Sequence, residues 1–135
     1  MDKKFLKKII AQSQEDLQII SACCSEAKLK TNDIKYLSSN KIFLLSISRL
    51  NKEAEDKKRI INSIIKFDSI ESSKSKNIDQ NDLDSILELF AINVFKREHN
   101  FEITLLFSKN RIITLSAELI DVTLEDQKFI NDKNT

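Results

Sequence analysis

The sequence predicts an α+β fold in which one N-terminal amphipathic helix packs on a curved antiparallel sheet, or on a small sandwich or barrel, of about seven or eight strands. Two observations support this fold class. Apolar residues recur at helical spacing between Gln14 and Glu26, and after this segment their period changes to two. The segments with a period of two are separated by short polar stretches rich in Asn and Ser, which are typical of turns between antiparallel strands.

A short strand over Lys7–Ala11 and one helix form the first part of the predicted fold. Ser13 is a typical N-cap residue, and Asp16 follows it at the position where a carboxylate favours the free amides of the first helical turn. The helix is expected over roughly Gln14–Glu26. Its apolar face consists of Leu17, Ile20, Cys24 and Ala27.

The sheet is expected to follow, after which a charged connection runs over Asn51–Lys58. Apolar residues then change from odd to even positions between Leu115 and Val122, which indicates a β-bulge near Leu119. The predicted strands are 34–38, 43–47, two within Arg59–Ser73 that bend around Lys66–Asp68, a hairpin of Phe101–Phe107 and Arg111–Ser116, and 120–124.

The segment Asp82–Phe95 fits two templates. Leu83, Ile86 and Phe90 belong to an apolar series with helical spacing, but the same stretch also fits a strand that is buried on both faces. We favour the strand, because a predicted hairpin follows it and antiparallel neighbours are usually sequential. A helix is the alternative.

The chain contains no glycine and no proline, although average usage would give about nine and about seven. Motifs that require glycine are therefore excluded: the P-loop, the dinucleotide-binding fingerprint, the nucleophile elbow and the EF-hand. Left-handed backbone positions must be occupied by the residues that tolerate them next best. We expect these positions at Asn32, Asn40, Asn77, Asn100 and Asn110.

The length of 135 residues fits one globular domain, expected over residues 1–126, with a disordered polar tail over 127–135. The net charge is +1, so no overall field attracts nucleic acid or an anionic membrane. No apolar stretch is long enough to cross a bilayer, and no signal peptide precedes the predicted domain. A cytoplasmic location is therefore expected. The alternative architecture is a barrel of the pleckstrin-homology-like kind.

The order of segments resembles an alphaproteobacterial family that is catalogued as domain of unknown function 2948. The similarity covers nearly the whole chain and consists mostly of core-type residues, so it implies a fold more than a site. The family has no established activity. The residues that carry the resemblance include Asp16-Leu17, Ser21-Ala22, Glu26-Ala27, Tyr36-Leu37, Phe43, Ser48-Arg49-Leu50, Phe67-Asp68, Ile78-Asp79, Leu87–Ile92 and Ile113-Thr114-Leu115.

The residue types that usually carry catalysis or bind metal are scarce. His99 is the single histidine, and no motif places a nucleophile beside it, so we interpret it as an exposed turn residue. Cys23 and Cys24 are interpreted as small hydrophobic residues of the helix. Asp79–Asp84 superficially matches a calcium loop, but Leu83 occupies a ligand position and the required glycine is missing. No cofactor or metal is expected.

Arg49 is the preferred polar candidate, because it stands at the end of a predicted strand in a chain where lysine dominates. The planar guanidinium suits a bidentate contact with a carboxylate or phosphate. Asp68 is its expected partner in a structural ion pair, and a ligand or partner protein is the alternative. Arg59 is the third candidate binding residue, as part of the basic cluster Lys57-Lys58-Arg59.

These observations favour a non-catalytic protein-binding or adaptor module, which would recognise another protein by strand addition at an open edge or by a polar groove near Arg49. The first alternative is an RNA-binding module, in which three basic clusters share one face. A small enzyme is less favoured and would need a pocket lined by Arg49, Asp68, His99 or a cysteine. The basic clusters are Lys3, Lys4, Lys7 and Lys8; Lys57, Lys58 and Arg59; and Lys74 and Lys76.

Overall fold

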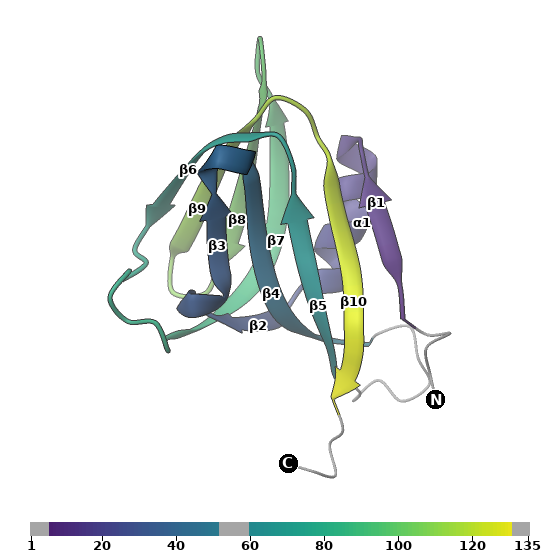
Figure 1. Cartoon of the computed structure of the whole chain (residues 1–135), viewed down its shortest axis with the longest axis vertical. Coiled ribbons are helices and arrows are strands. Elements are labelled where there is room, and N and C mark those ends of the chain that lie inside the picture. The colour runs from purple at the N-terminus through teal and green to yellow at the C-terminus, as the bar shows by residue number, and fades with distance from the viewer. Residues whose placement is uncertain (1–5, 52–59, 131–135) are drawn as a thin grey trace.

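The computed structural model describes residues 6–51 and 60–130 and is shown in Figure 1. Within these residues the chain forms one α-helix and a single antiparallel sheet of ten strands, which curls but does not close into a barrel. The α+β class is thus confirmed. The barrel alternative is wrong, and the predicted number of strands is too low.

The helix α1 spans Gln14–Cys24. Two short 3-10 helices, η2 (Thr31–Asp33) and η3 (Ser38–Asn40), flank the third strand. The strands are β1 (Lys8–Ala11), β2 (Ala27–Lys30), β3 (Ile34–Leu37), β4 (Ile42–Leu50), β5 (Ile60–Phe67), β6 (Ile70–Lys76), β7 (Ile86–Lys96), β8 (Phe101–Phe107), β9 (Arg111–Ala117) and β10 (Val122–Ile130).

The helix begins as its sequence predicts and ends two residues early. The Ser13 hydroxyl accepts a hydrogen bond from the backbone N–H of Asp16 at 3.1 Å, which confirms the N-cap. Glu26 has a φ of 71°, so the chain turns there and enters β2. This strand was not predicted from the sequence, although Ala27 and Leu29 are buried and alternate with exposed lysines.

The strands follow the order β1-β10-β5-β4-β2-β7-β8-β9-β6, and β3 pairs with β4 outside this path. β4 therefore has β5 on one side and two short strands on the other. β3 pairs with its first half, whereas β2 touches its second half through Lys28 and Ser48 and continues the sheet to β7. Figure 1 shows β2 crossing the lower end of the molecule.

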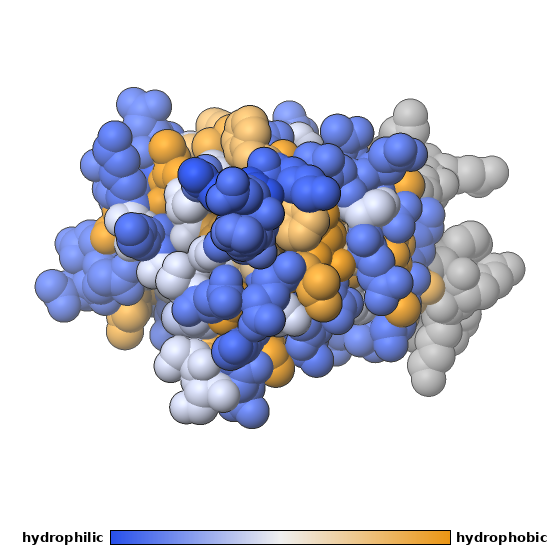
Figure 2. Space-filling view, turned by 90° about the horizontal axis from the view of Figure 1, so that it is seen from above, coloured by the Kyte–Doolittle hydropathy of each residue, from blue (hydrophilic) through white to orange (hydrophobic). Residues whose placement is uncertain are grey.

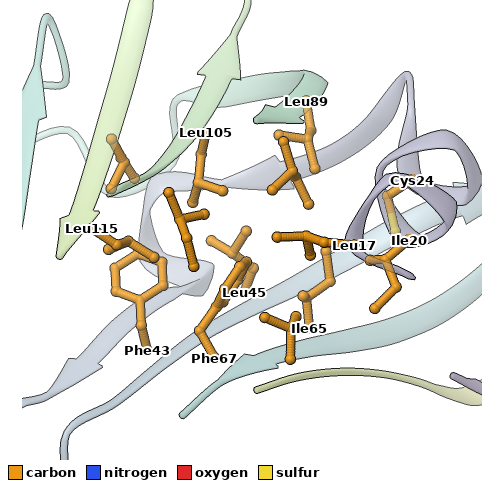
Figure 3. Packing of buried hydrophobic residues seen from close by; sticks show 14 of the residues in the cluster. Leu17, Ile20, Cys24, Phe43, Leu45, Ile65, Phe67, Leu89, Leu105 and Leu115 are labelled. Carbon is orange, nitrogen blue, oxygen red and sulfur yellow. The ribbon is translucent and has the colours of Figure 1, made fainter. Parts of the chain in front are cut away.

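The inner side of the curled sheet holds the hydrophobic core (Figure 3). Leu17, Ile20 and Cys24 of α1 pack against the inward residues of the strands. Phe43 and Phe67 meet edge to face, with ring centroids 5.9 Å apart. The helix thus serves as the cover of the core on one side of the sheet.

Residues 86–95 of the segment 82–95 lie in β7, whereas residues 82–85 form a turn before it, so the strand is confirmed over most of the segment and the helix is excluded. The register against β8 shifts between Leu89 and Ala91. Buried positions move at this bulge from Leu87 and Leu89 to Ile92, which explains why the sequence also matched a helical spacing.

The bulge predicted near Leu119 is wrong. β9 ends at Ala117 and β10 begins at Val122, so the change of parity falls in the connection between two strands. Leu119 is 60% exposed in this connection.

Left-handed residues lie where the chain turns, but only two of the five predicted positions are correct. Asn77 and Asn110 have φ values of 65° and 59°. Asn32 and Asn40 lie inside 3-10 helices, and Asn100 also lacks a positive φ. Among the described residues, the other left-handed positions are Glu26, Lys41, Ser69 and Lys109, so this chain accepts the steric cost at residues other than Asn.

β10 continues to Ile130, four residues beyond the expected end of the globular domain at residue 126. The rest of the predicted tail, residues 131–135, lies outside the described residues. Among the residues that the structure describes, no helix is long and apolar enough to span a membrane.

Candidate functional site

Arg49 and Asp126 form an ion pair inside the sheet, and neither side chain has any exposed area. The pair is bidentate: Nε and Nη2 of Arg49 donate to Oδ1 and Oδ2 of Asp126 at 3.1 and 2.9 Å. The Ser63 hydroxyl and the backbone N–H of Lys7 complete the carboxylate's contacts at 2.7 and 2.9 Å. Four hydrogen bonds thus connect the Asp126 carboxylate of β10 to β4, to β5 and to Lys7, the residue before β1.

Burial raises the pKa of the Asp126 carboxyl, but the hydrogen bonds from Arg49, Ser63 and Lys7 lower it by more. The pKa of Asp126 therefore lies below its ordinary value. The carboxylate is the form that the buried guanidinium requires, because an unpaired buried charge is strongly unfavourable.

The predicted structural ion pair at Arg49 is confirmed, but its expected partner is wrong. Asp68 lies instead near Lys66, with 3.8 Å between Oδ1 and Nζ, and both side chains are partly exposed. The sequence did carry a signal for Asp126, since Val122 and Leu124 place the even positions of this segment on the core side. Arg59 lies outside the described residues.

The other candidates are not brought together. His99 is exposed in the turn between β7 and β8, 3.3 Å from Glu98, as expected for a turn residue. Cys24 is buried in the core and Cys23 is half-buried. Asp79 accepts a hydrogen bond from the backbone N–H of Asn81 and so stabilises a local turn. Across residues 6–51 and 60–130, no group of three or more potential ligands is placed to hold a metal ion.

The basic clusters are only partly described. Lys8 lies on β1, and Lys74 and Lys76 lie on β6, which are the first and last strands of the sheet order. Figure 2 shows one end of the molecule as mostly hydrophilic, with separate hydrophobic patches between the polar side chains.

The outer face of β3, β4, β5, β10 and β1 has a depression with a volume of ≈ 570 Å³, which we call the outer hollow. Its apolar residues are Ile10, Leu37, Ile42, Leu44 and Ile64. Ile10 and Leu37 are 55% and 45% exposed. The solvent-facing side of an antiparallel sheet is usually polar, so this apolar set is a departure from the expected pattern.

A second depression separates β3 from β6, and we call it the β3–β6 groove. It has a volume of ≈ 200 Å³. No strand pairing joins β3 to β6 within the described residues. At one end Tyr36 Oη donates to the carbonyl of Ile70 at 3.1 Å, and the N–H of Ile70 donates to the carbonyl of Lys41 at 2.9 Å. The groove is lined by Thr31, Ile34, Tyr36, Phe43, Ser73, Ser75, Ile78, Gln80 and Ile113.

These features define a single-sheet α+β protein with a buried ion pair and two depressions that open to solvent. The chain belongs to the family described as a protein of unknown function (DUF2948), whose model matches residues 7–133. The resemblance stated from the sequence is thereby confirmed. No curated protein and no solved structure matches the chain.

Proposed function

We propose that this protein is a non-catalytic protein-binding module that docks a partner protein on the outer hollow. The observation that carries the proposal is the apolar character of β4 and β5 on both faces. Phe43, Leu45 and Ile65 fill the core, whereas Leu44 and Ile64 lie on the opposite face and line the hollow.

Burial of the outer residues by a partner would be favourable. Fully burying a Leu or Ile side chain is worth about 1.5–3 kcal/mol relative to leaving it exposed. Exposed apolar patches on soluble proteins commonly mark interaction sites. Ile10 and Leu37 are exposed and Leu44 is half-buried, and none of the three belongs to the core cluster, so their accessibility supports a docking role.

The charges around the hollow favour a protein over a nucleic acid. Lys8 and Lys66 line it together with Asp121 and Glu125, so positive and negative side chains balance. A phosphate backbone binds to a surplus of positive charge. The complementary partner surface is an apolar patch that is flanked by charges of both signs.

Arg49 has an indirect role in this proposal. Its guanidinium is buried against Asp126 and therefore does not reach a partner. It instead fixes β4 relative to β10, two of the strands that form the floor of the hollow.

Photo-crosslinking tests the proposal in the native host. A photoreactive phenylalanine analogue at position 44 is expected to yield a defined adduct with another protein, resistant to nuclease. Position 119 is the matched control, because Leu119 is also apolar and exposed but lies outside the hollow. The double substitution Ile10→Glu, Leu37→Glu should abolish the adduct while the melting temperature stays close to that of the wild type.

Equal adducts from positions 44 and 119, or no protein adduct at position 44, would overturn the proposal. Loss of the adduct on nuclease treatment would favour RNA instead. An adduct with a second copy of the chain would show self-association and would also contradict an adaptor role.

A further inference from the structure

We infer that the β3–β6 groove is a second binding site, which takes an extended acidic segment of a partner chain along β6. The groove and the outer hollow share β3 and β4, but the groove includes β6 and no residue of β1, β5 or β10. The inference does not depend on the proposed function. Three features of the groove support the inference: an uncovered strand edge, a small pocket and a row of lysines.

The strand β6 has the length and exposure needed for strand addition. It spans Ile70–Lys76 and, within the described residues, pairs only with β9. After Ile70 none of its residues is buried. Ser73 and Ser75 lie opposite the buried Leu115 and Ile113 of β9, yet they remain accessible from the groove. An extended peptide can therefore bond to the edge of β6 and place alternate side chains in the groove.

The pocket fits one side chain better than a whole ligand. Its volume of ≈ 200 Å³ is below the 300–1,000 Å³ that is typical of small-molecule sites. Phe43, Ile34 and Ile113 provide apolar walls, and Ser73 and Ser75 provide hydroxyl groups. No charged residue lines the pocket. An uncharged side chain, apolar or aromatic, is the complementary occupant.

Three lysines beside the groove favour a negatively charged partner segment. Lys35 alternates with Ile34 and Tyr36 on β3, and Lys74 and Lys76 alternate with Ser73 and Ser75 on β6. All three are exposed, and none forms an ion pair with another described residue. Side chains of a bound strand that point away from the groove would face these lysines, so acidic residues complement them.

The nearby acidic residues do not cancel this preference. Asp33 accepts a hydrogen bond from the backbone N–H of Lys30, and Asp79 caps its own turn. Glu118 pairs with Lys41 at 2.9 Å. Glu71 is the one acidic residue on β3 and β6, against three lysines.

The same lysines disfavour a second copy of β6 as the occupant. Two identical edges would place Lys74 and Lys76 near their counterparts, and like charges on adjacent strands are unfavourable. Edge lysines are a common means of preventing such pairing. The occupant is therefore a different, acidic chain.

Selection from a displayed library of random twelve-residue peptides tests the inference. The library is selected on the wild-type protein and counter-selected on Ser73→Phe, which fills the groove from β6. Enriched peptides are expected to alternate Asp or Glu with apolar or aromatic residues. No enrichment over the counter-selection, or enrichment of neutral or basic peptides, would overturn the inference.

Binding of the most enriched peptide then locates the site. Ser73→Phe should weaken it at least about tenfold, and Ser72→Phe, the exposed neighbour on the same strand, by less than about twofold. The double substitution Lys74→Glu, Lys76→Glu should weaken binding, and Lys8→Glu, Lys66→Glu in the outer hollow should not. Ile10→Glu, Leu37→Glu should also leave peptide binding unchanged, which separates this site from the proposed function. The opposite pattern would contradict the groove as the binding site.

Discussion

Two strand edges of the curled sheet differ in how they are covered: one lies against the helix, and the other borders an open groove. The upper edge of β7 is covered by α1: the Ser21 hydroxyl accepts from the N–H of Ile92 at 2.9 Å, and Gln14 donates to the carbonyl of Val94 at 3.2 Å. Figure 1 shows α1 between β7 and the strands β1 and β10. Across the β3–β6 groove, the hydrogen bonds of Ile70 with Tyr36 and Lys41 join the two sides at one end.

The difference shows that a strand edge is covered where the covering element both buries apolar side chains and forms hydrogen bonds with the strand's backbone. At the helix-covered edge, α1 buries Leu17, Ile20 and Cys24 in the core. Ser21 and Gln14 of the same helix form hydrogen bonds with backbone groups of β7. At the groove, Ser73 and Ser75 bring little apolar area to bury. The first edge is thus part of the stable core, and the second is left accessible.

The largest expected effect concerns the buried ion pair of Arg49 and Asp126. Asp126→Asn should lower the free energy of unfolding by about 3–5 kcal/mol, because it leaves the buried Arg49 charge without a counterion. Urea denaturation measures this loss. Asp68→Asn is the control: its pair with Lys66 is partly exposed and should contribute at most about 1 kcal/mol. Equal losses would contradict a special role for the buried pair.

Acidification should weaken the same contact. The pKa of Asp126 is lowered in the folded chain, so its carboxylate contributes stability above the unfolded value of about 3.9. This contribution is lost as the pH falls from about 5 through the lowered pKa of the folded state. Urea denaturation between pH 6 and pH 3 should therefore show a smaller decline for Asp126→Asn than for the wild type. Parallel declines would exclude Asp126 as a source of the acid sensitivity.

A matched pair of serines compares the two edges directly. Ser21→Ala removes the acceptor for the Ile92 N–H, and the expected loss is about 1 kcal/mol after the gain in helix propensity is included. Ser73→Ala in the groove should change stability by less than about 0.5 kcal/mol. Hydrogen exchange at Ile92 should accelerate only in Ser21→Ala. A larger loss from Ser73→Ala would reverse the comparison.

A smaller effect than that of Ser21→Ala is expected at the bridged end of the groove. Tyr36→Phe removes the hydroxyl that donates to the Ile70 carbonyl, at an expected loss of about 0.5–1 kcal/mol. The amides of β6 should exchange faster in this variant, whereas those of β7 should not change. A loss above about 2 kcal/mol would show that the groove is more firmly closed than its few contacts imply.

Local patterns in the sequence predicted the elements whose residues carry their own signal. Ser13 with Asp16 located the start of the helix, and the sequential hairpin favoured β7 as a strand. The left-handed turn residues were harder to predict from the sequence, because Lys41 and Ser69 adopt positive φ as a result of how the strands on either side are placed. The steric preference of a single residue favours Asn at left-handed positions, but it does not determine which residue of a turn adopts a positive φ.

The candidate site depended on contacts that are distant in the chain. Arg49 was identified as a carboxylate-binding residue, but its partner lies 77 positions away on a strand with a register shift between Asp126 and Lys128. Alternation in β10 placed Asp126 on the core side, whereas only the tertiary fold brings it to Arg49. The β3–β6 groove was not predicted, because it arises where two strands fail to pair.

The pairing of β1 with β10 has a consequence for how the chain folds as it is synthesised. Of the described strands, β1 is synthesised first, yet its one strand partner among them is the last, with Lys8 opposite Glu125 and Ala11 opposite Val122. Contacts of such large sequence separation form late, since a long loop must close first. β1 must therefore remain without this partner until β10 has been synthesised, and the pairing of the two strands then completes one end of the sheet.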